Sequence, residues 1–389
     1  MAEVLCEGAE VASLTTSALC EASSIPATTR PIEIRRLKLL ERTRSTGSET
    51  EPTSKRRKTR SSQVGRGEQS SCSLVGSDPN PVNPKEEDLD RLDAAVRCPR
   101  YGVTSVCGRR RDMEDAVSIR PDFVPNRHFF GVFDGHGCSH VATTCQERMH
   151  ELVAEEWEKK IESKESQMTD TWTEVMKQSF DRMDGEAVNW TGEGRVPVCR
   201  CQQGRPMRSE HVGSTAVVAV VGPTRIIVSN CGDSRAVLSR NGVAVPLSSD
   251  HKPDRPDELE RIQSAGGRVI YWDGPRVLGV LAMSRAIGDS HLKPFVMAEP
   301  EVSVTDREEG DECLILGSDG LWDVVTNEMA CEVVRTCLQS NEPVRGEGEV
   351  GRASDKACSD AALLLTKLAL ARRSSDNVSV VVVDLRRNV

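Results

Sequence analysis

Apolar positions follow no regular spacing over residues 1–95, whereas from about residue 96 onward apolar runs alternate with amphipathic segments. Ser, Thr, Pro, Glu and Arg dominate the first part. A segment of that composition cannot bury enough apolar surface to offset the entropy lost on ordering. The pattern therefore predicts a disordered tail over residues 1–95 and a folded domain over residues 96–389.

Within residues 96–389, short apolar runs bounded by Gly, Asn or Asp predict strands, and runs with apolar residues three and four positions apart predict helices. The expected strands are 117–123, 128–134, 215–221, 225–232, 235–247 (with an internal Asn-Gly turn), 312–320 and 377–385. The expected helices are 145–161, 257–267 and 354–373. Segments 191–210 and 340–356 are expected to be loops. Hairpin turns join several strands, so we expect an α+β fold in which helices cover antiparallel sheets.

The net charge of −9 argues against a nucleic-acid partner, because an acidic chain has no bulk attraction to nucleic acid. Its dense basic cluster, residues 54–60 (SKRRKTR), has no aromatic residues interleaved for base stacking. We interpret this cluster as a nuclear import signal, and the alternative is a solvated charge run in the tail. No nucleic-acid partner is expected.

The chain contains no apolar run of the roughly 20 residues that a membrane helix needs, so no membrane association is expected. Glu3, Glu7 and Glu10 interrupt the N-terminal segment where a secretory signal would be apolar. The 14 cysteines are scattered without zinc-site spacing, which favours reduced thiols. We expect a monomer in the nucleus and cytoplasm.

Acidic residues stand near the ends of four predicted strands. They are Glu114 and Asp115 before 117–123, Asp134 in 128–134, Asp319 and Asp323 near the end of 312–320, and Asp376 before 377–385. Carboxylates that converge near a core need protons, basic partners or a metal, and oxygen ligands suit Mg²⁺ or Mn²⁺ rather than zinc. Two such ions about 3.5–4 Å apart can bind a hydroxide and hold a phosphate for in-line attack. A single Asp-Gly pair is usually only a turn, but four such places in one domain favour a metal centre.

Basic groups near these acids could complete a phosphate site. Arginines 109–111 could clamp a phosphate with two parallel hydrogen bonds, or could be solvated surface. His136 follows Asp134 by two residues. Alone it would most often be a hydrogen-bonded structural histidine, but beside a phosphate it is a candidate acid for the leaving alkoxide.

A rival chemistry rests on Cys199 and Arg205, which have the spacing of cysteine-nucleophile phosphatases. That site needs a long helix directly after the loop, because the helix N-terminus binds phosphate and lowers the thiol pKa. Pro206 follows here and a strand is expected from about Gly213, so there is no room for the helix. Chance spacing is the favoured interpretation.

Seven motifs occur in order over residues 101–385: RxxxMED, FGVFDGHG, VGSTAVV, SNCGDSRAVL, LAMSRAIGD, SDGLWD and SDNVSV. This series resembles the type 2C, metal-dependent Ser/Thr protein phosphatases. The resemblance implies a four-layer αββα sandwich, with two antiparallel sheets between helices. It also implies hydrolysis of phosphoserine and phosphothreonine by a metal-activated hydroxide at a two-metal centre.

The resemblance assigns a role to each site residue, motif by motif. Asp134 resembles the carboxylate that bridges both ions. Direct ligands are expected from the Gly135 carbonyl, Asp319 and Asp376. Metal-bound water is expected at Glu114 and Asp115, and a weaker third ion at Asp233 and Asp323. Arg110 matches the phosphate-binding arginine and His136 the general acid.

Residues 267–289 resemble more narrowly the plant clade A branch, which represses abscisic acid signalling. There a flap tryptophan inserts beside the hormone-bound receptor, and Trp272 matches it. Trp272 precedes Asp273-Gly274-Pro275, which indicates an exposed turn tip suited to a binding anchor. The alternative is a tryptophan folded back onto its own domain. Gly137 lies where the receptor loop would approach, and a side chain there should obstruct docking.

The clade resemblance implies partners. The substrates would be phosphorylated, stress-activated kinases of the sucrose-nonfermenting-related type, and abscisic acid receptors would inhibit the enzyme. An alternative is a kinase-binding scaffold in which catalysis is secondary.

Overall fold

The computed structural model describes residues 98–162, 168–189, 211–340 and 355–386. The predicted tail, the basic cluster at 54–60, Cys199, Arg205 and the segment 191–210 lie outside the described residues, as does most of 340–356. The predicted domain boundary at residues 95 and 96 therefore stays a prediction.

Two antiparallel sheets form the centre of the fold. The seven-stranded sheet has the order β11 (Ile287–Gly288), β4 (Gly213–Ser214), β3 (Arg127–His136), β5 (Ala216–Val221), β6 (Arg225–Cys231) and β12 (Glu301–Asp306), with β2 (Asp115–Val124) paired to β3. The five-stranded sheet has the order β1 (Tyr101–Val106), β14 (Val378–Asp384), β13 (Asp311–Gly317), β7 (Arg235–Arg240) and β8 (Val243–Pro246). Because every sheet neighbour is antiparallel, the hairpin signals in the sequence are confirmed.

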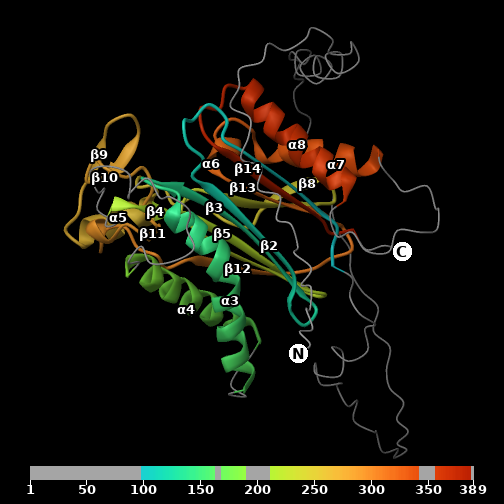
Figure 1. The fold of residues 1–389 in the computed structure, drawn as a ribbon, viewed down its shortest axis with the longest axis horizontal. Coiled ribbons are helices and arrows are strands. Elements are labelled where there is room, and N and C mark those ends of the chain that lie inside the picture. Colours follow the sequence, from blue (N-terminus) through green and yellow to red (C-terminus); the bar gives the residue numbers. More distant parts are fainter. Residues whose placement is uncertain (1–97, 163–167, 190–210, 341–354, 387–389) are drawn as a thin grey trace, which may run out of the picture. The chain divides into compact units, whose positions relative to one another are not determined.

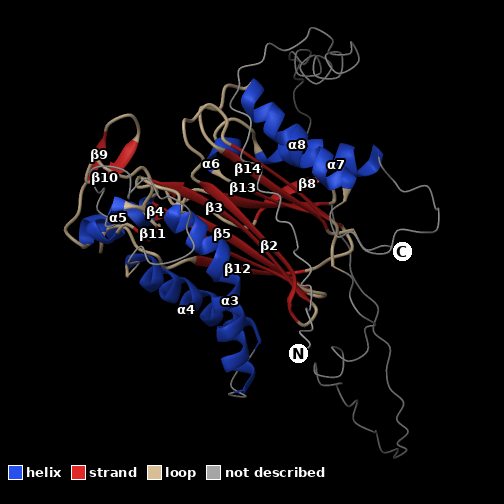
Figure 2. Cartoon of the chain, viewed as in Figure 1, coloured by secondary structure: helices blue, strands red, loops and turns tan. Residues whose placement is uncertain are grey.

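Helices cover the outer face of each sheet (Figure 1; Figure 2). They are α3 (His140–Glu162) and α4 (Met168–Val188) on the seven-stranded sheet, and α7 (Asn327–Ser340) and α8 (Lys356–Ala371) on the five-stranded sheet. Strand β3 shows why: Phe130 points into the core between the sheets, while Phe129 and Phe133 point outward to α3 and α4. The four-layer αββα sandwich is confirmed.

The structure corrects several expected elements. Helices α4 and α7 and strands β1 and β12 were not predicted. The apolar residues of α4 are sparse, and the helix is held by tertiary contacts such as the stacking of Trp172 on Trp157, with ring centroids 4.2 Å apart. Strand β13 ends at Gly317, and Asp319 instead begins the short helix α6 (Asp319–Trp322). None of the described helices is long and apolar enough to cross a membrane.

A buried ion-pair cluster fixes helix α5 (Pro256–Ser264), and its titration gives a testable prediction. Glu258 is 1% exposed and accepts hydrogen bonds from Arg285 (2.6 Å) and Arg261 (2.7 Å). Burial alone would raise the pKa of Glu258, but the two arginines outweigh it and lower the pKa to about 2. A depressed pKa stabilises the fold above the unfolded value and loses that effect as pH falls through the folded value.

We expect Glu258→Gln to lower the free energy of unfolding at pH 7 by about 3–5 kcal/mol, because the buried Arg285 and the half-buried Arg261 lose their counter-charge. Urea unfolding should show a constant difference from wild type down to about pH 5, and a shrinking one between the ordinary value of 4.5 and about 2. The matched control is Glu260→Gln, an exposed residue of the same helix, which should change little. A difference that does not shrink in acid would contradict this account.

Candidate active site

The predicted carboxylates meet at one end of the two sheets. Strand pairing places Asp115 directly opposite Asp134. Asp319 follows β13 and Asp376 precedes β14, and these two strands are neighbours in the other sheet. The hydroxyl of Ser318 donates a hydrogen bond of 2.9 Å to Oδ2 of Asp115, which links the two sheet ends directly.

The pKa values of these carboxylates respond to their burial and to one another's charge. Burial, together with repulsion from Asp115 and Asp319, raises the pKa of Asp134 well above its ordinary value. Burial and the charges of Asp233 and Asp323 do the same for Asp319. The pKa of Asp115 is raised to about 6, chiefly by burial. Such mutual repulsion indicates a group of acids that requires positive charge.

Two basic side chains supply part of that charge. Arg110 donates to Oδ2 of Asp376 at 2.6 Å, as its predicted place beside the acids suggests. Lys252 donates to Oδ2 of Asp233 at 2.7 Å and was missed by the sequence analysis. Burial would lower the pKa of Lys252, but the Asp233 carboxylate raises it. Partial burial raises the pKa of Asp323, and the charge of Lys252 opposes that shift.

Carboxylate oxygens without protein partners test whether the cluster suits a cation. Oδ1 of Asp115, Asp233 and Asp319 is buried in each case and accepts no hydrogen bond within the described chain. Among the described residues, no group of three or more Asp, Glu, His or Cys side chains is arranged around a single cation position. Because Arg110 and Lys252 hold one oxygen each of Asp376 and Asp233, those carboxylates are turned toward the protein's own cations. The set fits a hard divalent ion: its donors are oxygens, and three of them lack a partner.

Hydrogen bonds to backbone groups give Gly135 and Asn377 structural roles around the carboxylate cluster. The amide of Gly135 donates to the carbonyl of Glu114 at 3.2 Å, which joins the two motifs that contain them. The side-chain oxygen of Asn377 accepts from the Glu114 amide at 2.8 Å. The Asn377 nitrogen donates to the carbonyls of Cys107 and Asp112. Asn377 therefore holds the loop that carries Arg110, a role that the sequence analysis missed.

His136 lies at the end of β3 beside this cluster. Its Nε2 is 2.6 Å from Oδ2 of Asp289, a buried residue that was not predicted as part of the site. Burial alone would lower the pKa of His136, but the Asp289 carboxylate outweighs it and raises the pKa. The imidazole is therefore held against a carboxylate rather than free in the cleft.

Trp272 lies at the tip of a separate hairpin formed by β9 (Val269–Tyr271) and β10 (Pro275–Val277). Its side chain is 77% exposed, so it does not fold back onto its own domain. The tip closes through a hydrogen bond of 2.9 Å from the Trp272 amide to the Gly274 carbonyl. Other exposed apolar side chains of this region are Ile270, Tyr271, Leu278 and Val280.

Gly137 has a structural reason for lacking a side chain. Its φ is +77°, and a Cβ built there would come within 2.7 Å of the His211 carbonyl oxygen. The family resemblance relates this glycine to the approach of a partner, but the chain's own fold already requires it. A side chain at this position therefore cannot report on docking alone.

We expect Gly137→Ala to lower the free energy of unfolding by about 1–3 kcal/mol and to reduce activity without any partner present. Thermal unfolding and phosphatase assays on the purified chain measure both. The control is Gly185→Ala, since a Cβ at that helical glycine meets nothing within 4 Å. Gly137→Ala with wild-type stability and activity would restore the docking explanation.

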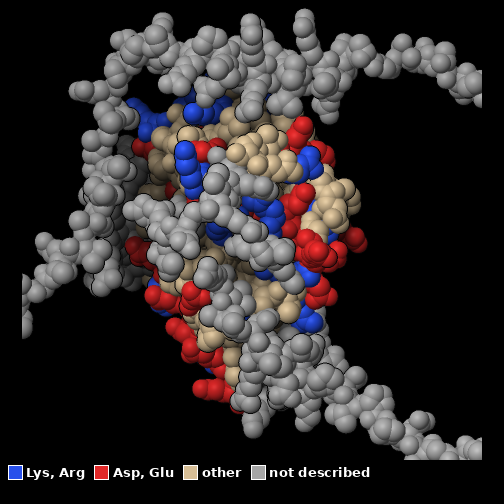
Figure 3. Space-filling model, turned by 90° about the vertical axis from the view of Figure 1, so that its right-hand side faces the viewer, with Lys and Arg blue, Asp and Glu red and all other residues tan. Residues whose placement is uncertain are grey.

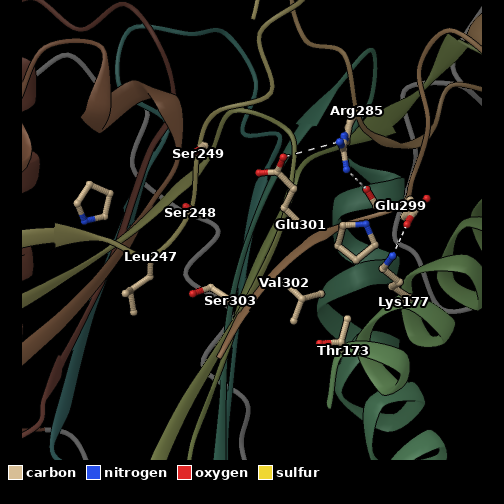
Figure 4. Close-up of a pocket in the computed structure, with 12 residues that line it drawn as sticks. Thr173, Lys177, Leu247, Ser248, Ser249, Arg285, Glu299, Glu301, Val302 and Ser303 are labelled. Carbon is tan, nitrogen blue, oxygen red and sulfur yellow. Dashed lines mark hydrogen bonds and ion pairs between the residues drawn. The ribbon is translucent and has the colours of Figure 1, made fainter. Parts of the chain in front are cut away.

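A pocket elsewhere in the described chain carries none of the predicted site residues (Figure 4). It lies between the start of β12, helix α4 and residues 246–249. Its charged groups are already satisfied, since Lys177 pairs with Glu299 and Arg285 donates to the Glu299 carbonyl at 2.9 Å. The face in Figure 3 shows both basic and acidic side chains, with the acidic ones prevailing toward the lower left. Neither surface adds chemistry to the carboxylate cluster.

Comparison with known proteins gives consistent results. The family model "Protein phosphatase 2C" matches residues 99–378. The chain is 61% identical over 341 residues to "Probable protein phosphatase 2C 9" of Oryza sativa subsp. japonica, covering 80% of this chain and 81% of that protein. It is 64% identical over 301 residues to "Protein phosphatase 2C 37" of Arabidopsis thaliana, covering 74% and 72%.

A solved structure supports the fold in particular. The match is to "Crystal structure of serine-threonine phosphatase 2C from Toxoplasma gondii", with a TM-score of 0.57, 24% identity, and coverage of 74% of this chain and 98% of that one. The roles of the individual site residues stay predictions.

Proposed function

The chain belongs to the protein phosphatase 2C family and is a serine/threonine protein phosphatase, and from this premise we propose that its carboxylate cluster holds two Mg²⁺ or Mn²⁺ ions. The observation that carries the proposal is the set of buried, unpartnered oxygens on Asp115, Asp233 and Asp319. Asp134, the Gly135 carbonyl, Asp319 and Asp376 would be the direct ligands of these ions, Glu114 and Asp115 would hold water beside them, and Asp233 and Asp323 would hold a weaker third ion.

The chain's own residues bind the phosphate and manage the leaving group. Bound divalent ions supply Lewis acidity and lower the pKa of coordinated water. The Arg110 side chain is 52% exposed at the edge of the cluster, so a phosphate can replace Asp376 on its guanidinium. His136 gives a proton to the serine or threonine oxygen as its bond to phosphorus breaks.

The proposed biological role is repression of abscisic acid signalling. In this role the enzyme dephosphorylates stress-activated kinases of the sucrose-nonfermenting-related type, and hormone-bound receptors inhibit it. Support comes from the sequence of residues 267–289 and from the exposure of Trp272 at a hairpin tip, where a partner can reach it. A monomer in the nucleus and cytoplasm is the proposed state, without nucleic-acid or membrane partners.

Phosphate release from a phosphothreonine peptide by the purified chain tests the activity. We expect release with Mg²⁺ or Mn²⁺ and none with excess EDTA. Undiminished phosphate release in EDTA would contradict the metal mechanism and favour the alternative in which Cys199 is the nucleophile.

The scaffold alternative predicts a different result in cells. A variant that lacks catalysis would then repress the kinase as well as wild type does. If repression instead follows catalytic competence, dephosphorylation is the mechanism.

A further inference from the structure

Three neighbouring strands, of which β4 and β11 have only two residues each, place His136 and Asp289 on either side of a single glycine. His136 of β3 pairs with Gly213 of β4, and Gly213 pairs with Gly288 of β11. Asp289 follows Gly288 directly. Residues 153 positions apart in sequence are thereby brought to a hydrogen bond of 2.6 Å.

Gly213 is what allows this contact. A Cβ built there would come within 2.1 Å of Asp289 Oδ2 and 2.7 Å of His136 Nε2. Only hydrogen leaves room for the carboxylate to cross the middle strand and reach the imidazole. The missing side chain at Gly213 therefore leaves the space in which Asp289 contacts His136.

Asp289 is held firmly in its own right. It is 2% exposed and has left-handed backbone angles (φ 48°, ψ 42°), a conformation that persists in a non-glycine residue only where surrounding contacts enforce it. Its amide donates to the Val212 carbonyl at 3.0 Å, and its carbonyl accepts from the Leu292 amide at 2.8 Å. Asp184 anchors the preceding residue by accepting from the Gly288 amide at 2.9 Å. The carboxylate is fixed before any substrate arrives.

One ring nitrogen of His136 is hydrogen-bonded, and the other has no partner within the described chain. Nε2 faces Asp289, whereas Nδ1 is buried and makes no hydrogen bond within the described chain. A doubly protonated ring has one N–H for the carboxylate and one for a group that the substrate brings.

We propose that Asp289 is a positioning residue that orients His136 for proton transfer to the leaving serine or threonine oxygen. The proposal rests on the proposed function, in which His136 is the acid. As a water oxygen bonds to phosphorus, the bond from phosphorus to the leaving oxygen breaks and its electron pair goes to that oxygen. The Nδ1 proton of His136 moves to the same oxygen, and the ring keeps its Nε2 proton toward Asp289. The attacking water loses one proton to solvent, and after the alcohol has left, the ring, whose side chain is 22% exposed, regains a proton at Nδ1.

The test compares two leaving groups with the full chain and Mn²⁺. A phosphothreonine peptide releases an alkoxide that needs a proton, whereas p-nitrophenyl phosphate releases a phenolate that is stable without one. We expect Asp289→Asn to lower kcat on the peptide about 10- to 100-fold, with KM nearly unchanged, and to change p-nitrophenyl phosphate hydrolysis less than about threefold. Asn tolerates the left-handed backbone, so the loop should keep its shape.

Two further variants make the comparison specific. Asp184→Asn loosens the same loop without touching His136, and should affect both substrates in equal proportion. His136→Asn should show the same selective loss on the peptide, and adding Asp289→Asn to it should cost nothing more.

A proton NMR measurement on the wild-type enzyme does not depend on whether the Asp289 variant folds. The wild-type proton NMR spectrum should contain a downfield signal from the Nε2–H held by the carboxylate, and His136→Asn should lack it. Equal losses on both substrates with Asp289→Asn, or absence of the NMR signal in wild type, would overturn the positioning role. Wild type that is inactive on both substrates would instead overturn the proposed function, and this inference with it.

Discussion

Asp134→Asn should abolish phosphate release while leaving the metal-free protein no less stable than wild type. Asp134 faces Asp115 across the β2–β3 ladder and is the proposed shared ligand, so its loss should lower kcat on a phosphothreonine peptide by about 10³-fold or more. The same carboxylate destabilises the metal-free fold, because burial and its acidic neighbours raise its pKa far above the ordinary value. Removing the charge relieves that repulsion.

Thermal and urea unfolding in EDTA at pH 7 measure the second part of this prediction. We expect the variant to be at least as stable as wild type in EDTA, since a raised carboxyl pKa costs stability at neutral pH. Adding Mn²⁺ should raise the melting temperature of wild type and not of the variant. Asp254→Asn, a change at an exposed acid outside the cluster, is the control. A variant that keeps its activity would show that Asp134 is not a ligand.

The same variant separates the enzyme from the scaffold in cells. A folded Asp134→Asn protein retains its surface, including the hairpin of β9 and β10, and loses only the chemistry. Kinase repression by this variant at the wild-type level would favour the scaffold alternative.

The sheets were predictable because their strands are marked by continuous apolar runs. Both faces of such a strand are covered. In β3, Phe129 packs against the helices and Phe130 packs against the second sheet. Helix α4 could not be found in the same way, because its polar residues outnumber the apolar ones and it is held by contacts such as Trp172 on Trp157 of α3. Helix α7 was missed although its buried residues Ala330, Val333, Val334 and Leu338 have helical spacing.

The acids of the site were predictable for a related reason. Each stands beside an apolar strand, so the acids converge once the two sheets form and pack against each other. Asp289 and Lys252 were missed because neither adjoins a strand of recognisable length. The place of Asp289 depends on the two-residue strands β4 and β11, whose register with His136 leaves no periodic signal. Lys252 reaches Asp233 from a loop, although the nearby sequence SDHKPD does contain an unassigned basic residue among acids.

Trp272→Ala should weaken inhibition by a hormone-bound abscisic acid receptor by about 30- to 1,000-fold, while leaving the free energy of unfolding within about 0.5 kcal/mol of wild type. The side chain is 77% exposed, so truncating it removes almost no packing from the domain. A tryptophan that becomes buried on docking contributes a large area at low entropic cost, which is why such residues dominate interfaces. Titrating receptor and hormone into the phosphothreonine peptide assay measures the inhibition constant.

The control for this prediction is another exposed apolar residue outside the hairpin, Val243, which is 62% exposed on β8. Val243→Ala removes a comparable exposed contact and should leave inhibition unchanged. Because p-nitrophenyl phosphate is small, its hydrolysis reports on the cluster without contact to the hairpin, and both variants should retain it. If Trp272→Ala and Val243→Ala respond equally to the receptor, the hairpin is not the docking site. Its exposed apolar tip would then have to serve another partner, the kinase substrate being the first to test, through KM on a phosphorylated kinase.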